Sequence, residues 1–274
     1  MSTARIDAHH HLWHYTRGKS AFLDAEEYTA IQQDYEAQEL GELIEIHGFD
    51  GTVVVQADQT LEETRFMLAQ AEQNAFIKAV VGWVDLGNPA SIEVLESWAG
   101  HPLFRGIRPE FTGDAVLVPE HAEVIAALER LGLGLDLMAF PGEIGTLVTL
   151  AGRHPDLSIN LNHCGYSEHG DDSLEPWRSE MRALSEQTDV TVKFSGVMWR
   201  LPPHWRNDLL FQAFDHLLET FGPGRLMWAS DWPHMEAHSN YAEWTSLSGD
   251  YLSRLSDTEQ AAIFGATATR TYRL

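Results

Sequence analysis

Gly51-Thr52-Val53-Val54-Val55 is the stretch of sequence that decides the fold. Its apolar, β-branched residues run on without the polar alternation of a half-exposed strand, which is typical of a parallel strand covered on both faces. Seven further β-rich runs are spread along the chain, and segments with helical spacing separate them. The expected strands cover residues 5–11, 52–57, 79–85, 104–108, 134–138, 157–163, 190–195 and 225–231.

Eight strands with helical crossovers predict a (β/α)8 TIM barrel, an α/β fold that here would form a single domain over residues 1–274. An open doubly wound sheet is the alternative. We favour the barrel because polar residues with catalytic chemistry follow many different strands, whereas an open sheet would concentrate them near one switch point. Residues 13–35 show no clear period, and we expect them to form a loop over the barrel mouth.

Composition limits the partners of this chain. The formal net charge is −23, which excludes nucleic acid and anionic membrane surfaces as favoured partners. No run approaches the roughly 18 apolar residues of a membrane span. The single cysteine, Cys164, permits no internal disulfide, and no signal peptide is apparent at the N-terminus. We therefore expect a cytoplasmic protein with a small-molecule substrate; whether it forms a homo-oligomer is left open.

The first expected strand ends in a His-x-His pair. Side chains alternate between faces along an extended strand, so His9 and His11 are expected to share one face with Asp7, while His10 points to the other. Two imidazoles side by side are a common beginning of a metal site. The pattern therefore favours metal ligation over a histidine-rich terminus without a role.

Polar residues also follow other expected strands. The C-terminal strand ends of a TIM barrel meet at one face, where active sites of this fold lie. We therefore expect a common site from the ends of strands six, eight, four and seven, which read Asn162-His163-Cys164-Gly165, Ser230-Asp231-Trp232-Pro233-His234, Arg108-Pro109-Glu110 and Lys193-Phe194-Ser195-Gly196.

Three of these motifs together resemble the amidohydrolase superfamily: Asp7-Ala8-His9-His10-His11, Asn162-His163-Cys164-Gly165 and Ser230-Asp231-Trp232-Pro233. Within it the chain is similar to the lactonase-like amidohydrolase-2 branch, which includes sugar lactonases, pyrone-dicarboxylate lactonases and sulfomuconolactone hydrolases. The likeness extends to residues 51–57, 81–86, 221–226 and 263–265. Each motif alone is weak, but the ordered set covers nearly the whole chain.

The resemblance implies roles for the matched residues. His9, His11, His163 and Asp231 would ligate one divalent metal, and three or four such ligands suit zinc. Asp231 would also take a proton from water as general base, and His163 would polarise the substrate carbonyl. Lactonases of this branch can lack a catalytic metal, so metal-independent catalysis stays open. Binuclear members carry a fifth-strand histidine that is missing from residues 133–138 here.

The predicted substrate contacts combine cations, a carboxylate and aromatic rings. Arg108 is expected to clamp an anionic or hydroxylated substrate, because its planar guanidinium can bind a carboxylate with two parallel hydrogen bonds. The alternative for each residue is packing or an internal ion pair. The predicted substrate-binding residues are Arg108, Lys193, Trp83, Asp136 and Trp232, and weaker candidates are Glu110, Trp199 and Arg200.

The resulting hypothesis is a hydrolase that opens a lactone of a sugar acid or of an aromatic-catabolic acid by aspartate-activated water. One alternative is a metal-dependent decarboxylase of an aromatic or muconate-type acid, because such enzymes share the His-x-His and Asp motifs. Another is a non-catalytic ligand-binding barrel. Sugar lactonases tend to have a small apolar residue where this chain has His234, so we expect no particular sugar.

Overall fold

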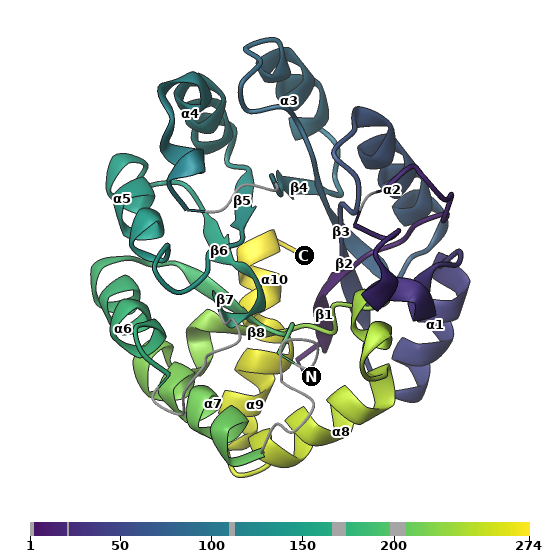
Figure 1. The fold of residues 1–274 in the computed structure, drawn as a ribbon, viewed down its shortest axis with the longest axis vertical. Coiled ribbons are helices and arrows are strands. Elements are labelled where there is room, and N and C mark those ends of the chain that lie inside the picture. The colour runs from purple at the N-terminus through teal and green to yellow at the C-terminus, as the bar shows by residue number, and fades with distance from the viewer. Residues whose placement is uncertain (1–2, 21, 110–112, 166–173, 198–206) are drawn as a thin grey trace.

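A computed structural model of the chain describes residues 3–20, 22–109, 113–165, 174–197 and 207–274. Eight parallel strands follow one another in chain order from β1 to β8. A parallel bridge between His10 and Trp232 brings β8 beside β1 and closes the ring seen in Figure 1. The strands are β1 Ile6–His10, β2 Gly51–Val55, β3 Ile77–Gly82, β4 Phe104–Ile107, β5 Gly134–Leu137, β6 Ile159–Leu161, β7 Thr191–Phe194 and β8 Leu226–Trp228.

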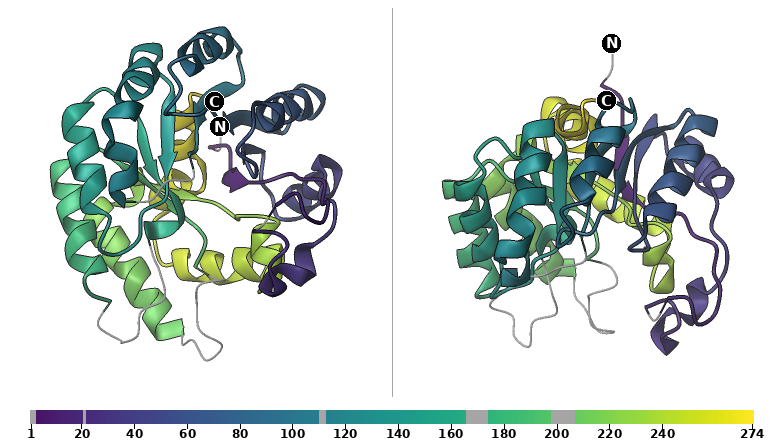
Figure 2. Two further views of the ribbon diagram at one scale, coloured as in Figure 1. Left: turned by 45° about the horizontal axis from the view of Figure 1, so that its top comes forward. Right: turned by 90° about the horizontal axis from the view of Figure 1, so that it is seen from above.

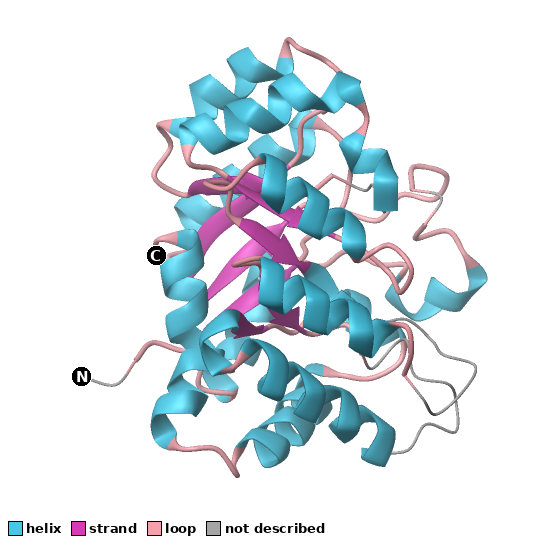
Figure 3. Cartoon of the chain, turned by 90° about the vertical axis from the view of Figure 1, so that its left-hand side faces the viewer, coloured by secondary structure: helices cyan, strands magenta, loops and turns pink. Residues whose placement is uncertain are grey.

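Helices surround the strands on the outside (Figure 3), so the predicted TIM barrel is confirmed and the doubly wound sheet is wrong. The α-helices are α1 Ala37–Ile46, α2 Leu61–Gln73, α3 Ser91–Ala99, α4 Ala122–Leu131, α5 Gly145–Arg153, α6 Trp177–Gln187, α7 Asn207–Phe221, α8 Tyr241–Leu252, α9 Asp257–Ala261 and α10 Thr267–Tyr272. The short helices are η1 Glu26–Ile31, η2 Gly113–Leu117, η3 Pro119–His121, η4 Asn162–Gly165, η5 Pro223–Arg225, η6 His234–Ala237 and η7 Ala262–Ala266. Across the described ranges, none of these helices combines the length and apolar character needed to cross a membrane.

Strand alternation divides the apolar core into two layers. Val53 and Val55 point into the barrel with Ile6 and Ala8, whereas Val54 packs under the helices. The C-terminal helix α10 adds Ala268 and Tyr272 to the inner cluster, so it closes the end of the barrel where the strands begin. Figure 2 shows both chain termini at that end, which leaves the opposite end for the functional site.

The segment expected to cover the mouth does so. An antiparallel bridge between Trp13 and Tyr35 ties its two ends together, and it contains the short helix η1. The Tyr35 ring packs edge-on against Trp232, with ring centroids 5.2 Å apart. We call residues 13–20 and 22–35 the cap.

One local expectation about strand faces is wrong. A bulge between Asp7 and His10 breaks the alternation of β1, so the Asp7 carboxylate accepts a hydrogen bond from Tyr241 of α8 rather than joining His9 and His11. His10 does point away from that pair, toward the Thr52 hydroxyl at 3.0 Å. Strand β6 ends at Leu161, and Cys164 is buried in the turn η4 that follows it.

Candidate active site

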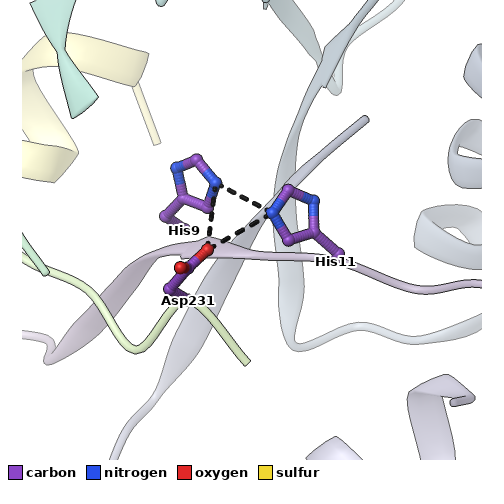
Figure 4. A group of neighbouring side chains, drawn as sticks. All are labelled: His9, His11 and Asp231. Carbon is purple, nitrogen blue, oxygen red and sulfur yellow. Dashed lines mark hydrogen bonds and ion pairs between the residues drawn. The ribbon is translucent and has the colours of Figure 1, made fainter. Parts of the chain in front are cut away.

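Four side chains converge at the C-terminal strand ends. His9 and His11 come from the end of β1, His163 follows β6 and Asp231 follows β8. The Oδ1 atom of Asp231 lies 3.7, 3.4 and 3.8 Å from the Nε2 atoms of His9, His11 and His163. Figure 4 shows three of them pointing at one another. All four are buried, the most exposed being His11 at 6%. The structure thus brings together all the predicted catalytic and metal-binding residues.

Unusual backbone conformations aim two of these side chains. His163 and Asp231 have φ angles of 53° and 64°, a left-handed region that is sparsely populated by residues other than glycine. Such residues persist where surrounding contacts fix them, and they cluster at active sites. The backbone N–H of Asp231 donates to the His9 carbonyl at 2.9 Å. Gly196 lies against His163, where any Cβ would stand 2.4 Å from the His163 Cβ, so only glycine fits.

The Nδ1 atom of each histidine has its own partner, which leaves the three Nε2 atoms turned toward the centre. Nδ1 of His11 lies 2.8 Å from the Val55 carbonyl oxygen. Nδ1 of His163 lies 3.0 Å from the Ser195 hydroxyl. Nδ1 of His9 lies 3.0 Å from Nζ of Lys193. Such partners of the second nitrogen fix ring orientation in metal sites.

Burial sets the charge states of the centre. Desolvation lowers the pKa of His9 well below its ordinary value, and the nearby cation of Lys193 adds to this. It also lowers the pKa of His11, although Asp231 opposes the shift. Burial disfavours an ionised Asp231, but the surrounding His163 and His234 hold its pKa well below the usual range. At neutral pH the centre therefore holds an ionised Asp231 beside neutral His9 and His11.

This donor set fits a divalent metal. One ligand atom from each of His9, His11 and Asp231 lies within 4.8 Å of the others. Ligands about 2.0–2.1 Å from a tetrahedral zinc ion stand about 3.3 Å apart. The distance between the Nε2 atoms of His9 and His11 is 3.2 Å, and the distances to Asp231 are close to the same value. His163 offers a fourth nitrogen 3.8 Å from Oδ1 of Asp231.

Above the centre lies a cavity of about 540 Å³. Its floor contains His11, His163 and Asp231, and the cap forms one wall. The remaining wall residues come from the loops after β2, β4, β5 and β8. The residues lining the cavity are His11, Trp13, Lys19, Ser20, Phe22, Ala57, Asp58, Gln59, Arg108, Met138, His163, Asp231 and His234. This volume suits a ligand of small-molecule size.

Arg108 lies in the cavity wall, as expected for a substrate contact. Its side chain contacts the Gln56 carbonyl at 3.4 Å and the Met138 sulfur at 3.0 Å. In the described part of the chain its buried Nε makes no hydrogen bond, and no carboxylate lies within ion-pair distance. The guanidinium thus keeps a positive charge and donor capacity at the cavity.

Other predicted substrate contacts are not in this wall. Lys193 and Asp136 lie beneath the centre, fully buried and paired with each other at 2.5 Å. Trp232 is 1% exposed and donates to Glu236, and the Trp83 backbone binds Thr64 beside β3. The cavity lining includes none of these four side chains. Glu110, Trp199 and Arg200 lie outside the described residues.

His234 is a contact that the sequence marked only as a departure from sugar lactonases. Its Nδ1 lies 3.0 Å from Oδ2 of Asp231, on the side away from the other three histidines. Phe22 and Tyr28 of the cap pack on its ring, each with centroids 5.2 Å away. The spacing of three residues from Asp231 could have indicated this contact. His234 therefore joins the cap to the aspartate.

A parallel barrel whose mouth holds two first-strand histidines and an eighth-strand aspartate defines a class, the TIM-barrel enzymes that can bind a metal and activate water. The family profile described as Amidohydrolase matches residues 6–274. The chain belongs to this amidohydrolase family, and it is a hydrolase.

Individual relatives match over the full length. An L-fucono-1,5-lactonase of Burkholderia ambifaria is 32% identical over 99% of this chain and 96% of its own. One of Burkholderia multivorans is 32% identical over 100% and 97%. The crystal structure of an amidohydrolase from Burkholderia multivorans with bound zinc superposes with a TM-score of 0.91 at 31% identity, covering 99% of both chains.

Proposed function

We propose that this protein hydrolyses a lactone, opening the ring of a cyclic carboxylic ester. The observation that carries the proposal is the position of Asp231 on the floor of a cavity, where its Oδ1 lies within 3.8 Å of Nε2 of His9, His11 and His163. The similarity to L-fucono-1,5-lactonases of two Burkholderia species supports the same reaction class.

In the proposed mechanism Asp231 removes a proton from water as the water attacks the lactone carbonyl. The same carboxyl group then returns the proton to the leaving alkoxide, so one residue serves as base and acid. His163, held by Ser195, stabilises the negative charge that develops on the carbonyl oxygen, and the His9 and His11 pair assists. A zinc ion bound by His9, His11 and Asp231 would lower the pKa of water and act as a Lewis acid.

The cavity wall suggests the substrate class. Arg108 presents a guanidinium without an internal carboxylate in the described chain, and Lys19 of the cap lies beside it in the cavity lining, 3.9 Å from the Asp58 carboxylate. Asp58 and Gln59 offer groups that bind hydroxyls. We propose a small lactone that carries hydroxyl or carboxylate substituents.

A panel of sugar-acid and aromatic-catabolic lactones tests the function. The purified protein should hydrolyse at least one of them, and Asp231→Asn should lower kcat at least about 10²-fold, the low end of general-base contributions. Asp215→Asn, which changes an aspartate remote from the cavity, serves as the matched control. Full activity of Asp231→Asn would remove the role given to this residue.

The decarboxylase alternative has weaker support. Strand β5 carries no histidine that could act as a further metal ligand. Its carboxylate, Asp136, forms an ion pair with Lys193. Release of CO₂ from 2-hydroxybenzoate-type or aminomuconate-type acids, with no hydrolysis of the lactone panel, would favour it. Ligand binding without turnover in either assay would point to the non-catalytic barrel.

A further inference from the structure

His9 differs from His11 and His163 in the hydrogen-bonding partner of its Nδ1 atom. The carbonyl oxygen of Val55 can only accept, so His11 must donate from Nδ1 and keeps a lone pair on Nε2. The Ser195 hydroxyl beside His163 can donate or accept. His9 instead faces Nζ of Lys193 at 3.0 Å. Metal-bound histidines almost always donate their other N–H to an acceptor, so His9 breaks this rule.

Burial lowers the pKa of Lys193, but the Asp136 carboxylate opposes this shift and favours the ammonium form. Nζ of Lys193 lies 2.5 Å from Oδ2 of Asp136, closer than an ordinary charge-assisted hydrogen bond. The same carboxylate receives the Asn160 amide at 2.7 Å and contacts the Tyr272 hydroxyl at 3.0 Å. All four side chains are buried, and none of them lines the cavity. Lys193 is therefore a fixed cation of the barrel interior.

An ammonium group has donors and no acceptor. Nδ1 of His9 must therefore accept from Lys193, and in the neutral ring the proton then sits on Nε2. This N–H points at the Nε2 lone pair of His11, 3.2 Å away. A consistent chain of donors results, from Lys193 through His9 and His11 to the Val55 carbonyl.

We propose that Lys193 is a positioning residue that holds His9 in the tautomer with its proton on Nε2, and thereby weakens the binding of a divalent cation by this site. A divalent cation can bind His9 only through a lone pair on Nε2, and in this tautomer Nε2 carries a proton instead. His11 and Asp231 remain ready to bind it, so the geometry of a metal site is present while Lys193 limits its affinity.

The first test reads the tautomers directly. Metal-stripped protein labelled with ¹⁵N in its imidazole rings is studied by two-dimensional ¹H–¹⁵N NMR, and His9→Gln and His11→Gln variants assign the two rings. We expect the proton of His9 on Nε2 and that of His11 on Nδ1. A His9 ring protonated on Nδ1 would overturn the proposal, and this measurement needs no change at Lys193.

The second test measures the zinc dissociation constant by competition with a chromophoric chelator. Lys193→Met alone would leave Asp136 buried and unpaired, so the double variant Lys193→Met/Asp136→Asn is used. Lys193→Arg is the matched control, because a guanidinium keeps a positive charge without an acceptor at His9. We expect the double variant to bind zinc about tenfold or more tightly than both wild type and control, the scale of outer-shell effects. Damage to the fold would weaken zinc binding and therefore cannot imitate the expected gain in affinity. Equal or weaker affinity of the double variant would contradict the proposal.

Discussion

Two buried aspartates in this barrel have opposite surroundings. Asp136 is fully buried and meets a resident cation, Lys193, together with hydrogen bonds from Asn160 and Tyr272. Asp231 is 1% exposed and meets imidazoles, with a cavity above it. The charge of the first carboxylate is balanced by a lysine at 2.5 Å, whereas the second lies within 3.8 Å of four histidine side chains.

This difference separates a structural ion pair from a chemical site. A buried charge that is paired inside the protein helps to define the packing of the interior, but its interactions are already satisfied and it does not bind a ligand. A carboxylate that lies among imidazoles beneath a cavity can still take a proton or a cation. His9 stands between the two regions, since its Nδ1 faces Lys193 and its Nε2 faces Asp231. The following predictions test this division.

The largest expected effect breaks the balanced pair. Lys193→Met should lower the free energy of unfolding by about 3–5 kcal/mol, because it leaves the Asp136 charge buried and uncompensated. Urea denaturation measures this loss. Asp231→Asn should cost clearly less stability, because the histidines around it can lose a proton and leave no buried charge uncompensated. Equal losses from the two variants would show that the aspartates do not differ in this way.

A second prediction concerns the cation that serves the cavity. Arg108→Gln should lower kcat/KM for a carboxylated or hydroxylated lactone about ten- to a hundredfold, mainly through KM, since hydrogen bonds to a charged group contribute about 1.5–3 kcal/mol. An unsubstituted lactone of the same ring size is the control and should be little affected. A uniform loss on both substrates would place Arg108 in the structural group with Lys193.

A buried imidazole without a carboxylate neighbour gives a third test. Burial lowers the pKa of His10 to about 3, below its value near 6.5 in the unfolded chain. Protons thus bind the unfolded chain more tightly, so stability is lost as the pH falls from 6.5 toward 3, by about 1.4 kcal/mol per pH unit from this group. Urea denaturation at pH 7 and pH 5.5 should give a smaller loss for His10→Gln than for wild type. Identical losses in the two proteins would contradict this assignment.

The smallest effect concerns the contact that orients Asp231. His234→Phe keeps an aromatic ring between Phe22 and Tyr28 but removes the hydrogen bond to Oδ2. We expect kcat to fall about three- to tenfold, in line with a net hydrogen-bond contribution of about 0.5–1.5 kcal/mol. His234→Gln retains a donor and should recover part of the loss. Equal kcat in the two variants would mean that ring packing alone matters.

Much of the site was predictable because it follows the register of strands. His9, His11, His163 and Asp231 stand at strand ends, and parallel strands of a barrel bring their ends to one face. The contacts of Lys193 and Asp136 were not predictable in this way. Both are polar residues near strand ends, and sequence spacing does not say whether such a residue faces the cavity or pairs below it.

The sequence by itself determined the barrel and the identity of the converging groups. Apolar strand runs, segments with helical spacing and ordered polar motifs are local signals, and each acts over a few residues. Tertiary structure alone decided the face of Asp7, the turn at His163 and the partner of Lys193. Each of these depends on a bulge, a strained backbone angle or a contact between distant strands, and none of the three has a local period that a sequence could reveal.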